Sequence, residues 1–302
     1  MWIIFSILTV LLWGTSETIF KSVSNNERNT VLKLIAYNGI IYGIVSVIYM
    51  LITKTEMNWN VIITYLPIAA IYIASMFCTY KAMRLVKVSI LSPIQNSSCV
   101  FVTILCMTIL HQQVEWYQLM AVGLIILGII LLSINKDETI MLARPDTEKA
   151  ISKSAAYMLY LKGLAFALGY MILDAIAGFM DENVLEADLS ENQVLVAYAL
   201  IYLVVGLVCL IYLIASHKTE GLFNFKEDKK KLVGSLVETA GQFTYIYAFA
   251  FGDAALASPF IAAYSAVTII LSRIFLKEKL KLRQYAMLAI VFIGMIILSV
   301  DG

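Results

Sequence analysis

Charged residues are scarce in this chain. Only 14% of its 302 residues are Asp, Glu, Lys or Arg, whereas 61% are hydrophobic and the mean hydropathy is +0.85. A soluble domain contains about 25% charged and roughly 45–50% apolar residues. A water-soluble fold of this composition could not cover its surface with polar groups, so the sequence argues against a soluble enzyme. The net charge of +1 provides no global field that would attract nucleic acid.

Cysteine and histidine are also rare. The two histidines lie at the ends of apolar segments, and the cysteines lie inside such segments without the spacing of metal ligands. The four cysteines are Cys78, Cys99, Cys106 and Cys209. No nucleotide-binding loop or nucleophile–base pair is recognisable. We therefore expect no metal, no cofactor and no enzymatic activity, and any transport would draw on an ion gradient or on the gradient of the substrate.

Ten apolar segments make up most of the chain. They cover residues 2–22, 31–53, 61–81, 88–110, 116–134, 155–178, 193–215, 232–251, 256–276 and 284–300. Each is close to the ~20 residues that cross a bilayer as a helix, and none alternates polar and apolar residues as porin strands do. The sequence predicts an all-α membrane protein with ten transmembrane helices. The first segment is too long for the apolar region of a signal peptide and is kept as a helix.

The chain contains an internal repeat. Shifting residues 92–133 forward by 166 positions, without a gap, places them on residues 258–299. Ser92-Pro93 then matches Ser258-Pro259, Gly128 matches Gly294, and most other pairs exchange one apolar residue for another. We expect two five-helix repeats, at residues 1–140 and 154–302, joined by a linker at 141–153.

Basic residues are distributed unevenly among the links between the segments. The odd-numbered links carry twenty Lys and Arg residues, and the even-numbered links carry only Lys54. The sixth link is acidic instead, with Asp181, Glu182, Glu186, Asp188 and Glu191. Because basic links stay in the cytoplasm, we expect the odd-numbered links there and both termini outside. Five segments per half is an odd number, so the two repeats would be inverted relative to each other, which suits alternating access.

Several short motifs resemble those of a known family. They are Trp13-Gly14 with Lys21 in the first segment, Tyr80-Lys81-Ala82 and Tyr247-Ala248 before the two Ser-Pro motifs, Glu278 after the ninth segment, and residues 284–294. The arrangement is similar to the EamA family of the drug/metabolite transporter superfamily and covers essentially the whole chain. The resemblance implies a ten-helix secondary transporter that moves small metabolites or amphipathic drugs.

Three acidic residues fall inside predicted spans. A charge in the bilayer costs roughly 2.5–3.5 kcal/mol and is expected to face a cavity or a partner. Glu238 shares a helical face with Gln242 and Tyr245, and Glu17 follows Trp13 by one turn. Asp174 lies nearer the outer end of the sixth segment. We expect all three to bind substrate or a coupling proton; the alternatives are an interhelical hydrogen bond for Glu238, pairing with Lys21 for Glu17, and a solvated helix end for Asp174.

Two further sets of polar residues suggest a central binding site. Asn38 and Tyr42 lie on one face of the second segment, and Tyr198 and Tyr202 lie on one face of the seventh. Aromatic rings attract cations, so these faces are expected to bind an amphipathic or cationic ligand; an interfacial aromatic belt is the alternative. Prolines near helix starts free backbone groups, which predicts hinges at Pro93 and Pro259 and cavity positions for three residues that follow them. These residues are Gln95, Asn96 and Tyr264.

Gly123, Gly128 and Gly294 are predicted to allow close packing of helices.

Three functions compete. The leading hypothesis is a secondary transporter of small organic metabolites, such as amino acids or amines, that works by alternating access. The second is a proton-coupled exporter of lipophilic cations or drugs. The third is a non-transporting membrane scaffold, which predicts no convergence of polar residues. For a transporter we expect a small-molecule substrate, a place in the plasma or inner membrane, a proton or another coupling ion, and either a monomer or a homodimer.

Overall fold

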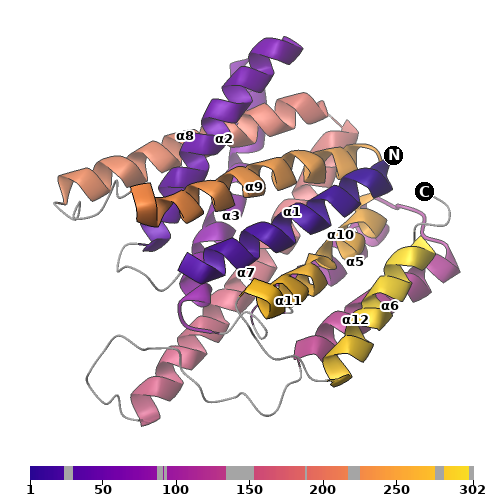
Figure 1. Cartoon of the computed structure of the whole chain (residues 1–302). Coiled ribbons are helices and arrows are strands. Elements are labelled where there is room, and N and C mark those ends of the chain that lie inside the picture. The colour runs from indigo at the N-terminus through magenta and orange to yellow at the C-terminus, as the bar shows by residue number, and fades with distance from the viewer. Residues whose placement is uncertain are drawn as a thin grey trace.

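The computed structural model describes residues 1–23, 30–86, 91, 94–133, 153–187, 189–216, 225–275 and 282–298. Within these ranges every element is an α-helix (Figure 1). The helices are α1 (Trp2–Val23), α2 (Thr30–Thr53), α3 (Trp59–Met83), α5 (Ser98–Ile109), α6 (Trp116–Ser133), α7 (Lys153–Ala187), α8 (Glu191–Ala215), α9 (Phe225–Ala250), α10 (Ala254–Ala262), α11 (Tyr264–Phe275) and α12 (Leu282–Leu298).

The apolar segments form helices because a helix satisfies its own backbone hydrogen bonds, as a bilayer requires. Polar residues fix the starts. The Asn58 side chain accepts a hydrogen bond from the backbone of Val61 at 2.9 Å and begins α3. Ser190 and Gln193 form a reciprocal capping box at the start of α8.

Six helices of the described part are long and apolar enough to cross a membrane. They span Trp2–Val23, Thr30–Thr53, Trp59–Met83, Tyr157–Ala187, Glu191–Ala215 and Ala254–Phe275, the last combining α10 and α11. Ile94–Ile109, Trp116–Gly128 and Tyr285–Ile297 are apolar but shorter. Large apolar side chains such as those of Ile48, Ile211 and Ile296 are exposed on the outside of the bundle, where lipid would contact them. The count of ten spans stays a prediction.

The sixth segment is longer than predicted. The sequence placed its end at residue 178 and put the following acidic residues in a solvated link, but α7 continues to Ala187. Asp181 and Glu182 are therefore helical, and both are buried. The apolar pattern stopped at residue 178 because these carboxyl groups face other helices of the bundle.

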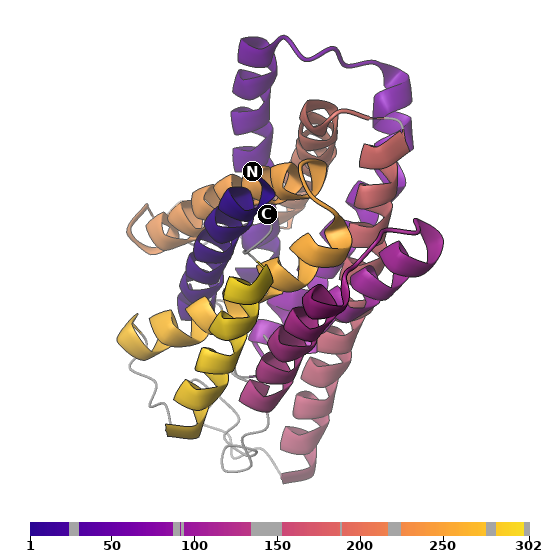
Figure 2. The same ribbon diagram turned by 90° about the vertical axis from the view of Figure 1, so that its right-hand side faces the viewer.

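Helices of the first half pack mainly on helices of the second half. α2 crosses and packs against α8, α6 lies along α12 at one side of the bundle, α1 lies along α9, and α3 packs against α7 (Figures 1 and 2). Exchanging the two halves converts the α1–α9 pair into the α7–α3 pair and leaves the α2–α8 and α6–α12 pairs unchanged. The α1–α11 and α5–α7 contacts are related in the same way.

Matched glycines lie where these helices approach most closely. A Cβ atom on Gly39 of α2 would lie 2.3 Å from the carbonyl oxygen of Tyr202 and 2.9 Å from Gly206 Cα on α8. Gly128 and Gly294 allow α6 and α12 the same close approach, as predicted. The prediction was wrong for Gly123, because nothing lies within 4 Å of a Cβ atom built there.

Two helical segments break at equivalent positions. Ala263 separates α10 from α11, and Ser97 separates the helical residues 94–96 from α5; the two positions differ by 166. Each break has the same i to i+3 hydrogen bonds, Ser97 N to Ile94 O at 3.3 Å and Ala263 N to Phe260 O at 3.2 Å. Tightened turns of this kind within helices often mark hinges.

The helix start predicted at the second Ser-Pro motif is wrong. Pro259 lies inside α10, which begins five residues earlier at Ala254, and the chain leaves the helix only at Ala263. Pro93 lies outside the described residues, as does the predicted linker 141–153 apart from Lys153, which begins α7.

Candidate functional site

A cavity lies between α1, α3, α7, α9 and α11. Its walls combine carboxyl groups, aromatic rings and two methionines. The lining residues are Trp13, Ser16, Glu17, Phe20, Tyr72, Met76, Thr79, Tyr80, Met83, Tyr170, Asp174, Glu238, Gln242 and Tyr264. Both halves of the chain therefore contribute to one cavity.

Three carboxyl groups reach this cavity, each from a different helix. Glu238 of α9 accepts a short hydrogen bond from the hydroxyl of Ser16. Glu17 of α1 accepts one from Thr268 at 2.7 Å, and Asp174 of α7 accepts one from Ser98 at 2.7 Å.

Among the described residues that line the cavity there is no Lys, Arg or His. Glu17 and Glu238 are 6% and 7% exposed, so water screens their charges poorly. The cavity therefore contains two acidic side chains that are largely shielded from solvent.

Aromatic rings supply the apolar part of the wall. Trp13 stacks on Tyr245 with ring centroids 5.0 Å apart, and Tyr264 meets it edge-on at 5.8 Å. The Trp13 indole nitrogen is buried and has no hydrogen-bond partner. An unpaired buried donor is costly, and a bound molecule with an acceptor group could satisfy it.

A second cavity adjoins the first. Trp13, Tyr72, Tyr170, Asp174 and Tyr264 line both. The second cavity extends to residues beside the two helix breaks, including Asn96, Ser98 and Ala262. Asp174 thus lies at the junction between the charged cavity and the broken helices.

Comparisons with known proteins identify the family. The sequence matches the EamA-like transporter family over residues 1–134 and 156–300. The chain belongs to this family. It is therefore a multi-pass membrane protein of the drug/metabolite transporter type, whose members are transporters and not enzymes.

The fold of this EamA protein has a counterpart of known structure. A protein described only as "protein" has a similar crystal structure, with a TM-score of 0.72 at 12% sequence identity over 99% of this chain and 96% of the other. At this identity the likeness concerns the fold alone. No curated protein matches the sequence.

The EamA transporter brings eight of the predicted site residues to its two cavities. Trp13, Glu17, Asp174, Glu238, Gln242 and Tyr264 line the first cavity, and Tyr245 joins some of them in the second. Asn96 lines the second cavity as well. Gln95 instead donates a hydrogen bond to Thr79, which itself lines the first cavity.

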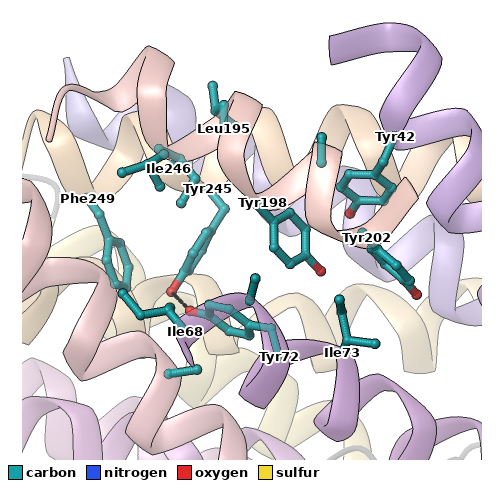
Figure 3. Close-up of a cluster of buried hydrophobic side chains, with 14 of the residues drawn as sticks. Tyr42, Ile68, Tyr72, Ile73, Leu195, Tyr198, Tyr202, Tyr245, Ile246 and Phe249 are labelled. Carbon is teal, nitrogen blue, oxygen red and sulfur yellow. Dashed lines mark hydrogen bonds between the residues drawn. The ribbon is translucent and has the colours of Figure 1, made fainter. Parts of the chain in front are cut away.

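The predicted tyrosine faces pack against each other instead of lining these cavities. Tyr42, Tyr198 and Tyr202 form one buried cluster between α2 and α8, with ring centroids 5.5 to 5.7 Å apart (Figure 3). Asn38 donates to the hydroxyl of Tyr80 in the same region. Tyr42 also donates to the backbone carbonyl of Glu238 at 3.3 Å, so this cluster supports the helix that carries the carboxyl group.

Sequence reasoning missed the contribution of α3 to the EamA site. Tyr72, Met76, Thr79 and Met83 all line the first cavity from this helix. Tyr65, Tyr72 and Thr79 repeat every seven residues and so share a face, which was the available signal. This spacing led to no prediction because the third segment contains no acidic residue.

Side chains close the bundle at both ends of the EamA site. At one end Lys21 donates to the carbonyl oxygens of Met83 and Val86, at 2.9 and 3.0 Å, where α3 ends. At the other, Gln112 donates to Glu182 at 2.5 Å and accepts from the backbone of Ala255 at 3.1 Å. The first end is predicted to face the cytoplasm and the second the outside.

Proposed function

We propose that this protein is a secondary transporter of small organic molecules that carry an amine or another cationic group, with amines and amino acids as the leading class. The observation that carries the proposal is the first cavity, which Glu238 and Asp174 reach without any Lys, Arg or His in its lining. Trp13, Tyr72 and Tyr264 add ring faces that stabilise cations.

We propose alternating access between two inverted halves as the mechanism. Exchanging the two halves gives the same set of helix pairs, and both halves contain a helix break at the same position of the repeat. Discontinuous helices at the interface of two repeats are typical of such transporters. Rocking of one half against the other about Ser97 and Ala263 would expose the cavity to each side in turn.

A proton-coupled exporter of lipophilic cations is the second candidate. The hydrogen bond between Ser16 and Glu238 favours it, because a buried carboxyl group with a hydroxyl partner can hold a proton or release it for a cation. A scaffold without transport predicts no polar convergence, and the three carboxyl groups at one cavity support a transporter instead.

A binding screen on the purified protein tests the ligand class. Alkylamines, amino acids, the aromatic cation ethidium and dicarboxylates would be compared by thermal shift, because a ligand that binds the folded state raises the melting temperature. Amines or cations are expected to raise it and dicarboxylates are not. A shift with dicarboxylates alone would overturn the proposed charge preference.

Uptake into proteoliposomes then tests transport itself. Glu238→Gln and Asp174→Asn are expected to abolish or strongly reduce uptake of the compounds that bind, while Glu115→Gln, which changes an exposed carboxyl group, transports as the unmodified protein does. Normal uptake by both cavity variants would contradict the role given to this site.

A further inference from the structure

A fourth carboxyl group is buried outside the first cavity. Asp181 of α7 is 0% exposed, and Tyr65 of α3 donates to its Oδ1 atom at 2.5 Å. The other oxygen, Oδ2, is buried without a hydrogen-bond partner. An ionised carboxylate is costly where one of its oxygens is buried and unpaired. This environment therefore suits the carboxylic acid, whose proton on Oδ2 has the Tyr72 hydroxyl beside the carboxyl group as an acceptor.

Within the described part of the chain, no cationic group faces Asp181 from the helices that pack around it. Tyr65 and Tyr72 of α3, Tyr198 of α8 and Tyr245 of α9 lie within its electrostatic reach.

The remaining titratable groups near this part of α7 are also acidic or neutral. Asp174 lies two turns before Asp181 on the same helix. Of the residues of α5, Cys99 faces Asp174 and Cys106 faces Glu182, and α10 has no titratable side chain. The described surroundings therefore leave a proton as the counter-charge for Asp181.

The side chain of Tyr72 interacts with the Asp181 carboxyl group and also lines both cavities. Tyr72 and Tyr245 share a hydrogen bond of 2.8 Å (Figure 3), and both rings line the second cavity. Gly178 lies between Asp174 and Asp181 on one face of α7, and a Cβ atom there would lie 3.5 Å from the Tyr245 hydroxyl and 3.8 Å from that of Tyr72. The Val102 side chain is closer still, at 3.2 Å, so the absence of a side chain at Gly178 lets Val102 and both hydroxyls pack against this face of α7.

We propose that Asp181 is a proton-binding site separate from the substrate cavity, and that Tyr72 and Tyr245 link it to Asp174. Only the role of this site, which is to carry the coupling proton, rests on the proposed function. A proton from the predicted outer side binds one Asp181 oxygen and forms the carboxylic acid. The hydroxyls of Tyr72 and Tyr245 then accept a proton and release their own, so that the net transfer ends on an Asp174 oxygen.

Infrared spectroscopy of the purified protein tests the site with the proton itself as the probe. The carbonyl stretch of a protonated carboxylic acid should grow as the pH falls, and Asp181→Asn should remove one such band. Asp181→Glu should retain a band at a shifted position, and Glu115→Gln should leave the band assigned to Asp181 unchanged. If Asp181→Asn does not fold, the shifted band expected in Asp181→Glu tests the proposal instead. An unchanged set of bands in the Asp181 variants would overturn the proposal.

Transport with and without an inward pH gradient separates this inference from the proposed function. If the unmodified protein moves none of the amines, amino acids or cations of the screen, the proposed function fails and the infrared result on Asp181 still stands. If it moves them, Asp181→Asn should lose all acceleration by the pH gradient while equilibrium exchange of the same compound continues. Acceleration equal to that of the unmodified protein would refute a coupling role for Asp181.

Discussion

At the residue scale, the cavity side chains divide into groups that set charge and groups that set shape. Glu238 and Asp174 each hold a hydroxyl partner, Ser16 and Ser98, which fixes the carboxyl group without neutralising it. Trp13 has no such polar partner and contacts its neighbours through its ring. Its contribution to ligand binding should therefore be separable from that of the acids.

Trp13→Leu should weaken the binding of ethidium while leaving the carboxyl groups in place. The loss should be about two- to thirty-fold, because a cation–π contact contributes roughly 0.5–2 kcal/mol. Trp116→Leu is the matched control, since Trp116 is 70% exposed at the start of α6. Titration of ethidium fluorescence on purified protein measures both. Equal affinities in the two variants would show that Trp13 does not face the ligand.

At the element scale, contact between the halves depends on a few crossing points. α2 and α8 cross at Gly39 and Gly206, where backbone meets backbone and no side chain can move aside. Further along these helices, Tyr49 and Tyr247 both donate to the Asn192 side-chain oxygen, at 2.6 and 2.8 Å, which joins α2, α8 and α9. These points should dominate the stability of the bundle.

Gly39→Ala should lower the melting temperature, because the added methyl would overlap the Tyr202 carbonyl and force the helices apart. Such overpacking costs on the order of 1–3 kcal/mol. Gly123→Ala is the control, since its methyl meets open space; alanine's better helix propensity should leave stability unchanged or raise it by up to about 1 kcal/mol. A Gly39→Ala protein as stable as the control would mean that α2 and α8 do not cross here.

Asn192→Ala should loosen the three-helix junction at the predicted outer end. It removes the acceptor of two part-buried tyrosine hydroxyls, which keep their hydrogen bond to each other. Each lost hydrogen bond is expected to cost about 0.5–1.5 kcal/mol. Asn60→Ala, an exposed substitution on α3, controls for the loss of an amide. Hydrogen exchange at the start of α8 should rise in the first variant only, and equal exchange in both would argue against the junction.

The sequence predicted helical faces better than it predicted what those faces contact. Glu238, Gln242 and Tyr245 share a helical face that is predicted to point to the interior, because polar groups in a bilayer avoid lipid. All three side chains are buried. Tyr42 and Tyr202 are also buried, as the same argument predicts, yet their rings contact each other and line neither of the two cavities. Helical periodicity shows which residues share a face, whereas the choice between cavity and neighbouring helix depends on how the halves pack.

At the scale of the whole molecule, the repeat is visible in both sequence and packing. The shift of 166 positions that aligns Ser92-Pro93 with Ser258-Pro259 also aligns the breaks at Ser97 and Ala263. The orientation of the halves is a separate matter, because helix pairing by itself does not fix which ends face the cytoplasm. It rests on the concentration of basic residues in the odd-numbered links.

Labelling of matched positions tests that orientation. Gln113 and Lys279 are equivalent under the shift of 166, but they lie in the fourth and ninth predicted links. In a background without the four native cysteines, a membrane-impermeant maleimide added to intact cells should label Gln113→Cys directly and Lys279→Cys only after permeabilisation. Parallel halves would place both on one side, whereas inverted halves place them on opposite sides. Alternating access by exchange of the two halves requires the second result, because only inverted repeats turn a cavity that opens inward into one that opens outward.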